Sequence, residues 1–109
     1  MLLQKRYTDQ QLEQIVEEAT IYMCACPAQV AAQLRQLREL YRYQSRCAQE
    51  PGNELSVHQE IASATIEAHA LMEDCLERVL TMEGWDPATL KMPEGLRRKR
   101  DTILGIEGD

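Results

Sequence analysis

The sequence contains no phenylalanine, and its aromatic side chains are one tryptophan and four tyrosines among 109 residues. A core without phenylalanine must be built from Leu, Ile, Val, Met and Ala, a set that together favours helices over strands. Hydrophobic residues still make up 44% of the chain and charged residues 28%, which is ordinary for a globular protein. The composition therefore predicts one all-α domain over residues 1–109, long enough to bury a single core.

Long apolar runs are also absent, because no stretch of the sequence is long enough to span a bilayer. The opening MLLQKRYTDQQ becomes polar after two leucines, so it lacks the apolar centre of a signal peptide. These features predict a cytoplasmic protein that does not enter a membrane. In that reducing compartment, we expect cysteines to act as packing residues, metal ligands or redox thiols rather than to form structural disulfides. The four cysteines are Cys24, Cys26, Cys47 and Cys75.

Positive charge is scarce, because twelve Lys and Arg stand against eighteen Asp and Glu, for a formal net charge of -6. This balance opposes nonspecific binding to nucleic acid. Two local exceptions are a basic stripe at helical spacing and the run LRRKR that starts at Leu96. Ion pairs with the acidic faces of neighbouring helices account for the stripe equally well, so nucleic acid is not the expected partner. The stripe consists of Arg35, Arg38, Arg42 and Arg46.

Common catalytic motifs are missing from the sequence. It has no glycine-rich phosphate loop, no nucleophile elbow and no paired Glu-x-x-His repeats of the di-iron bundle type. We therefore expect a non-enzymatic protein.

Apolar residues recur at helical spacing in three long segments. The first predicted helix covers residues 8–25, with Thr8 or Asp9 as its cap. Pro27 lacks a backbone donor and disfavours helical geometry at the residue before it, so the chain should break there and a second helix should cover 27–47. Turn residues 51–53, Pro-Gly-Asn, end that helix and predict an antiparallel neighbour.

The third predicted helix, residues 55–83, is the longest and should stop at Gly84. Its apolar arc covers roughly 220°, which is wider than one packing partner requires. The sequence therefore predicts a three-helix antiparallel bundle that self-associates, as a homodimer through residues 55–83. One strip of the arc contains His58, Ala62, His69, Met72, Leu76 and Leu80, and the other contains Val57, Ile61, Ala64, Ala68, Leu71 and Cys75.

The C-terminal region should be a short helical appendage followed by a basic tail. Asp86 and Pro87 have the character of a cap and a first helical position, so they predict a short helix over residues 87–91. Residues 93–109 hold the basic run and form the predicted tail.

The stretch YMCACPAQV places two cysteines directly before a proline. An antiparallel pair of helices of equal length would bring Cys75 level with Cys24 and Cys26, because Pro27–Cys47 and Leu55–Cys75 are the same distance apart. A helix start favours the thiolate form of a cysteine. This cysteine cluster is a candidate metal site, for zinc or an iron–sulfur cluster, or a redox pair, with His69 as a further candidate ligand.

Simple packing is the alternative for these thiols, because cysteine is among the residues most often buried and the spacing lacks the paired motifs of structural zinc sites. His58 and His69 stand about 16 Å apart along one helix, too far for one mononuclear site, so we expect each to be hydrogen-bonded to its neighbours. The sequence as a whole predicts a small helical protein that acts through protein–protein contacts, with the thiolate site as the alternative function.

Overall fold

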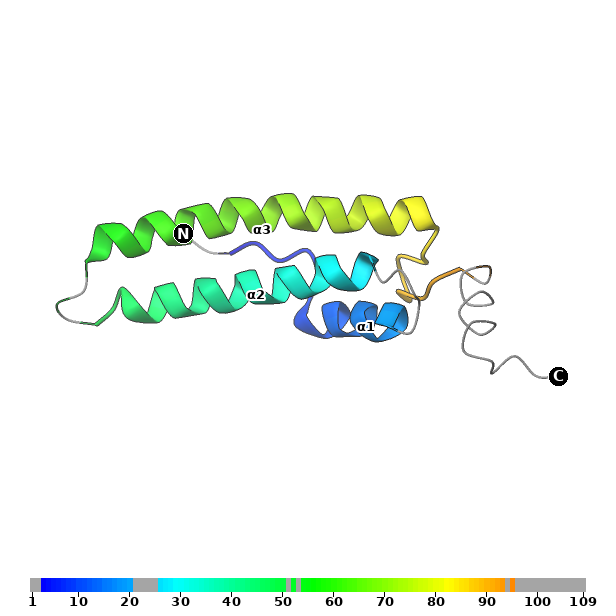
Figure 1. Ribbon diagram of the computed structural model, residues 1–109, viewed down its shortest axis with the longest axis horizontal. Helices are drawn as coiled ribbons and strands as arrows, with labels where there is room; N and C mark the ends of the chain where they lie inside the picture. The colour runs from blue at the N-terminus through cyan, green and yellow to red at the C-terminus, as the bar shows by residue number, and fades with distance from the viewer. Residues whose placement is uncertain (1–2, 21–25, 51, 53, 94, 96–109) are drawn as a thin grey trace.

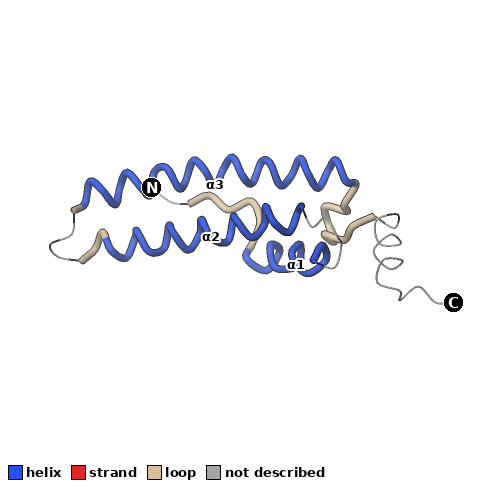
Figure 2. Tube along the Cα trace, viewed as in Figure 1, coloured by secondary structure: helices blue, strands red, loops and turns tan. Residues whose placement is uncertain are grey.

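The computed structural model describes residues 3–20, 26–50, 52, 54–93 and 95. These residues contain no strand and three helices, α1 (Asp9–Thr20), α2 (Cys26–Cys47) and α3 (Leu55–Glu83), so the all-α prediction is confirmed. In Figure 1, α2 and α3 lie side by side, with the end of α2 and the start of α3 at the same end of the molecule. The shorter α1 lies beside α2 near the opposite end (Figure 2). None of the described helices is long and apolar enough to cross a membrane.

Helix α1 begins where the sequence predicts a cap. The hydroxyl of Thr8 accepts the backbone N–H of Gln11 at 3.0 Å, and the side chain of Gln11 accepts the N–H of Thr8 at 2.8 Å. This reciprocal capping box satisfies two donors that a helix start leaves unpaired. The helix ends at Thr20, and the remainder of the predicted range, residues 21–25, lies outside the described residues.

Helix α2 begins at Cys26, one residue before the predicted start. Pro27 therefore occupies the first turn, where its missing N–H has no intrahelical partner to lose. The structure describes α1 and α2 as two separate helices, and the predicted break between them falls on residues 21–25, which lie outside the described residues. Along α2 the small residues Ala28 and Ala31 are buried together with Leu34.

Helix α3 matches its predicted range of 55–83 and ends as expected at Gly84. Gly84 has φ 78°, a left-handed conformation that glycine adopts without a Cβ clash. The N–H of Gly84 bonds to the carbonyl of Thr81 at 3.1 Å, and that of Trp85 bonds to the carbonyl of Leu80 at 2.9 Å. With 29 residues, α3 is about 43 Å long and longer than either partner helix.

The predicted short helix over 87–91 is wrong, because residues 87–89 form a turn instead. The carboxylate of Asp86 accepts the N–H groups of Ala88 and Thr89 at 2.8 and 3.3 Å, and Leu90 has φ 57°. The carbonyl of Asp86 also accepts the N–H of Leu90 at 2.8 Å, so the cap predicted at Asp86 is present, but the left-handed Leu90 ends the segment after one turn. Apart from Pro93 and Gly95, the predicted basic tail 93–109 lies outside the described residues.

Helix α2 lies in the middle, since its backbone approaches both α1 and α3, while no Cα atom of α1 lies within 8 Å of one in α3. Two non-helical segments complete the packing. Residues 3–8 bind α3, and the segment after α3 binds α1 through a 3.2 Å bond from the N–H of Met92 to Glu18. The described core is one cluster, made of Leu12, Ile15, Ala19, Ala28, Ala31, Leu34, Leu76, Leu80, Trp85, Leu90 and Met92.

Candidate functional site

A group of buried charged and polar side chains borders this core. Arg38 of α2 leaves only 1% of its side chain exposed, and its guanidinium binds groups from three other elements. Its Nε donates to His69 Nε2 at 3.0 Å, while its terminal nitrogens donate to Asp9 at 2.6 Å, to the carbonyl of Tyr7 at 2.6 Å and to Glu73 at 3.3 Å. We call Arg38, His69 and Glu73 the polar centre.

Glu73 also binds the backbone of the segment before α1. The N–H groups of Arg6 and Tyr7 donate to the same carboxylate oxygen of Glu73, at 2.7 and 3.1 Å. The Arg6 side chain forms ion pairs with Asp74, at 2.6 Å, and with Glu77. We call residues 3–8 the N-terminal strap; in Figure 1 it is the dark blue segment that joins α1. The polar centre thus fastens the strap to both long helices.

The imidazole of His69 is fully buried, and its two nitrogens have different surroundings. Because Nε2 accepts the bond from Arg38, a neutral ring carries its proton on Nδ1. Nδ1 lies 3.8 Å from Glu73, and it is a buried atom without a hydrogen-bond partner among the described residues. Burial lowers the pKa of His69, Arg38 and Lys5 lower this pKa further, and Glu73 and, more weakly, the backbone of Gln4 oppose the change.

Asp9 connects α1 to the polar centre from the solvent side, with 58% of its side chain exposed. The hydrogen bond from Arg38 lowers the pKa of Asp9, against a smaller opposing effect of burial. The cluster therefore balances a buried cation with one buried and one exposed carboxylate. Such an arrangement stabilises a folded state only while all of its members are present.

The structure places the predicted thiols on separate helices. Cys26 is exposed at the start of α2, and Cys75 is partly buried on α3, as is Cys47 at the end of α2. Cys24 lies outside the described residues, which contain no group of three ligand side chains able to hold a metal ion. His69 belongs to the polar centre. The thiolate site of Cys24, Cys26 and Cys75 stays a prediction.

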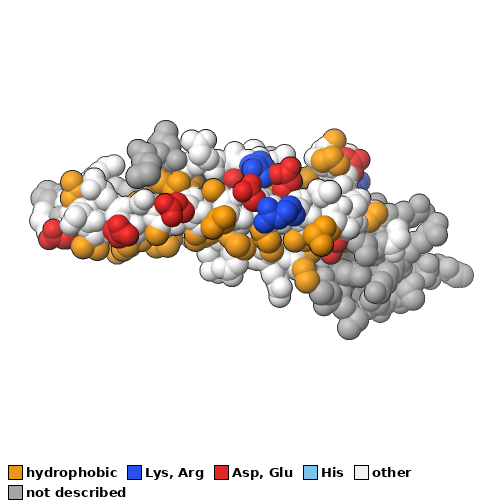
Figure 3. Space-filling model, turned by 90° about the horizontal axis from the view of Figure 1, so that it is seen from above, with side chains coloured by type: hydrophobic (Ala, Val, Ile, Leu, Met, Phe, Trp, Pro, Cys, Tyr) orange, Lys and Arg blue, Asp and Glu red, His pale blue; other side chains and the backbone are white. Residues whose placement is uncertain are grey.

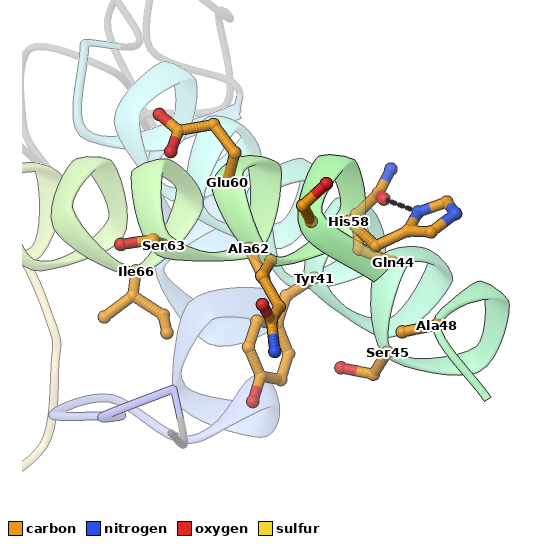
Figure 4. A pocket seen from close by; sticks show the side chains of 11 residues that line it. Tyr41, Gln44, Ser45, Ala48, His58, Glu60, Ala62, Ser63 and Ile66 are labelled. Atoms are coloured by element: carbon orange, nitrogen blue, oxygen red, sulfur yellow. Dashed lines mark hydrogen bonds between the residues drawn. The ribbon is translucent and has the colours of Figure 1, made fainter. Parts of the chain in front are cut away.

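The other histidine lies where α2 and α3 approach their connecting turn. His58 Nδ1 is 2.6 Å from the side-chain oxygen of Gln44, which is buried. Both histidines are therefore hydrogen-bonded to neighbours, as expected. An open groove of about 640 Å³ lies beside this pair, with aliphatic, amide and hydroxyl side chains in its wall (Figure 4). Labelled side chains of the wall include Tyr41, Gln44, Ser45, His58, Ser63 and Ile66.

Helix α3 presents an apolar strip to solvent on the side away from the polar centre. The exposed fractions of Val57, Leu71 and Met82 are 50%, 68% and 84%. Figure 3 shows hydrophobic side chains in a row along the molecule, with acidic side chains beside them. We call this row the outer strip, and its residues follow each other at spacings of four and three up to Cys75. They are Val57, Ile61, Ala64, Ala68, Leu71, Cys75 and Met82.

Sequence reasoning missed most of the polar centre. It placed Arg38 in a surface stripe and assigned no role to Glu73 or Asp9 in a buried network, whereas Arg38 and Glu73 are buried. A signal was present, because Arg38 follows Leu34 by four residues and Glu73 precedes Leu76 by three, so each lies on an apolar face. Met82, the most exposed apolar side chain of the outer strip, was also not assigned to it.

The comparisons with known proteins return no relationship: no family model, no curated protein and no solved structure matches this chain. The fold by itself defines an all-helical protein with a buried polar centre and an exposed apolar strip on its longest helix.

Proposed function

We propose that this protein is a non-enzymatic helical protein that acts through protein–protein contacts, with a second copy of the chain as partner and the outer strip of α3 as the contact surface. The observation that carries the proposal is the exposure of Val57, Leu71 and Met82 along one line of one helix. Single exposed apolar side chains are common, but a continuous apolar line is characteristic of an interaction surface.

The geometry of the outer strip supports a helical partner. Val57 to Cys75 spans about 27 Å, and its alternating spacings of four and three give the 3.5-residue period of a coiled-coil seam, which Arg78 interrupts before Met82. A seam with this period packs well against an identical helix, and two identical chains related by a two-fold axis are the simplest closed assembly. The period and the exposure therefore support a homodimer.

Charge supports a parallel arrangement of the two copies. Glu60 and Glu67 lie on one edge of the outer strip at a seven-residue interval, while Asp74, one interval further, is ion-paired with Arg6, and Arg78 lies on the same edge. An antiparallel pair would set these carboxylates of the two copies against each other, whereas a parallel pair sets them against the uncharged opposite edge of the partner helix.

Within one chain we propose that α2 and α3 form an antiparallel pair in a bundle, since Gln44 meets His58 and Arg38 meets His69. We place the protein in the cytoplasm.

Sedimentation of matched variants tests the contact surface. Leu71→Glu changes the centre of the outer strip, and Leu55→Glu makes the same change on the same helix at a residue that is 52% exposed but off the strip. Burial of one leucine is worth about 1.5–3 kcal/mol, so Leu71→Glu should weaken the dimer at least about tenfold. Leu55→Glu should sediment like the unchanged protein. A wild-type protein that stays monomeric at the highest concentration reached contradicts the proposal.

Oxidation tests the orientation of the two copies, because Cys75 lies within the outer strip. In a parallel pair the two Cys75 residues face each other at a distance that a disulfide bridges. Mild treatment with oxidised glutathione should therefore give a covalent dimer in the wild type and in Cys47→Ala, but not in Cys75→Ala. A covalent dimer that persists in Cys75→Ala would contradict the parallel arrangement.

The alternative function is the thiolate site of Cys24, Cys26 and Cys75, which binds zinc or an iron–sulfur cluster or changes redox state. The observation that favours it is the exposure of Cys26 at the start of α2, where the helix dipole favours a thiolate. Protein purified without chelator should then contain metal or absorb visible light, and Cys75 should be protected from oxidation. Colourless, metal-free protein with slowly reacting thiols would refute this alternative.

A further inference from the structure

The N-terminal strap is a non-helical segment, and the side chains of the polar centre both accept hydrogen bonds from its backbone and donate one to it. Glu73 accepts the N–H groups of Arg6 and Tyr7, and Arg38 donates to the carbonyl of Tyr7. These bonds cross from a non-helical segment to α2 and α3, and His69 is in contact with both of the side chains that make them. A change at His69 therefore acts on every one of these backbone bonds.

We propose that the polar centre is a proton-sensitive latch that holds the N-terminal strap against α2 and α3 and releases it when His69 takes up a proton. The proposal goes beyond the proposed function, because it concerns the attachment of the strap to Glu73, Asp74 and Glu77 of α3 and not the partner of the outer strip.

The proton comes from solvent and binds the only lone pair that the neutral ring offers, which is on Nε2. That lone pair now accepts the N–H of Arg38, so protonation breaks the 3.0 Å bond and sets two cations against each other. Arg38 must then turn away, which withdraws its bond to Tyr7. The imidazolium Nδ1–H attracts Glu73 from 3.8 Å, which draws this carboxylate away from the strap amides.

The charged groups around His69 come from every element packed against it. Arg38 of α2 and Lys5 of the strap disfavour the imidazolium, while Glu73 of α3 and, to a smaller extent, the backbone of Gln4 in the strap favour it. Asp9 of α1 acts through Arg38, to which it is bonded. Burial adds to the two cations, so that the pKa of His69 in the latched state lies below its ordinary value of 6.5.

The direction of the pH effect follows from the pKa of His69, which is lower in the latched state than in the released state. A released strap leaves His69 hydrated, with a pKa near the ordinary value, so the released state binds the proton more tightly than the latched state. The latch therefore holds at full strength above the ordinary pKa and weakens as the pH falls from there towards the lowered pKa. Between pH 7.5 and 5.5 the ratio of released to latched protein should rise as much as about tenfold.

Amide hydrogen exchange measures the release, because the N–H groups of Arg6 and Tyr7 are the strap's donors to Glu73. After correction for intrinsic exchange, their protection should fall about tenfold between pH 7.5 and 5.5 in the wild type. The amides of Leu34 and Leu76, in the middle of α2 and α3, should show no comparable fall. A fall shared by those two amides would mean that the helices themselves unfold, and it would overturn the proposal.

Variants identify the titrating group. In His69→Gln a neutral amide oxygen can accept the Arg38 bond at every pH, so protection at Arg6 and Tyr7 should become independent of pH. His58→Gln removes the other histidine and should keep the wild-type response. Arg6→Ala loosens the strap but keeps the polar centre, so it should lower protection at both pH values by the same factor. An unchanged pH response in His69→Gln would refute the latch even if that variant is less stable.

Discussion

Replacement of Arg38 by methionine tests whether the polar centre holds the fold as a unit. The change removes four hydrogen bonds, two of them to carboxylates, and leaves Glu73 buried with only 5% of its side chain exposed. Removal of one partner from a buried ion pair costs about 3–5 kcal/mol, because the remaining charge has lost its compensation. A domain of this size is stable by only about 5–15 kcal/mol, so Arg38→Met should lose a large part of its stability.

A double-mutant cycle shows where this cost originates. Glu73→Gln removes the buried charge and keeps a side-chain oxygen that can accept the strap amides. The double variant Arg38→Met with Glu73→Gln should therefore be more stable than Arg38→Met alone, and the two single costs should exceed the double cost by about 2 kcal/mol or more. Arg38→Lys is the matched control: it keeps the charge but cannot reach His69, Asp9 and Glu73 together, so its cost should be intermediate.

Urea unfolding followed by circular dichroism at neutral pH measures the wild type and the four variants, with equal slopes required before the free energies of unfolding are compared. If Arg38→Met cost less than about 1 kcal/mol, it would match an ordinary surface substitution, and the reasoning from burial would be refuted. If the single costs simply added in the double variant, Arg38 and Glu73 would act independently. In that case the polar centre could not be treated as a unit.

Three further predictions concern single sites, each measured as a change in the free energy of unfolding. Leu76→Ala should cost about 2–5 kcal/mol, whereas Met82→Ala on the outer strip should change the isolated chain by less than about 0.5 kcal/mol in urea unfolding. Thr8→Ala should lose about 1 kcal/mol in thermal unfolding, because it removes the cap of α1. Gly84→Ala should lose about 1–2 kcal/mol by the same assay, since φ 78° strains any residue with a Cβ. Equal costs at Leu76 and Met82, or no cost at Thr8 or Gly84, would contradict the assigned positions.

Helix positions were predictable because their signals are local. Pro27 near a helix start and Gly84 just past a helix end follow from the backbone geometry of single residues, and the period of apolar residues gives the segments between them. The range predicted for α3 is therefore confirmed. The prediction for 87–91 failed for a local reason as well, since Asp86 does cap a turn, but nothing in the sequence marks Leu90 as the left-handed residue that ends it.

The polar centre was not predictable in the same way. A periodicity argument places charged side chains towards solvent, because an unpaired buried charge is costly. Arg38 and Glu73 are exceptions, because each buried charge is compensated by the other. They are separated by 35 residues in the sequence. The strap adds to the difficulty, since residues 3–8 have no periodic pattern and bind through their backbone. Charged residues that occupy apolar positions of two neighbouring helices were the available signal.

The polar centre also fixes the alignment of α2 and α3 along their axes, because the apolar core specifies this alignment poorly. Without phenylalanine, and with Ala19, Ala28 and Ala31 among its members, the core has few bulky side chains that fit only one position. A slip of α3 by one turn, about 5.4 Å, would move His69 and Glu73 away from Arg38 and leave a buried guanidinium without its acceptors. The outer strip, by contrast, has no comparable buried ion pair among the described residues, and its apolar side chains face solvent. One face of α3 is thus specified by polar bonds inside the chain, while its outer strip is apolar and exposed.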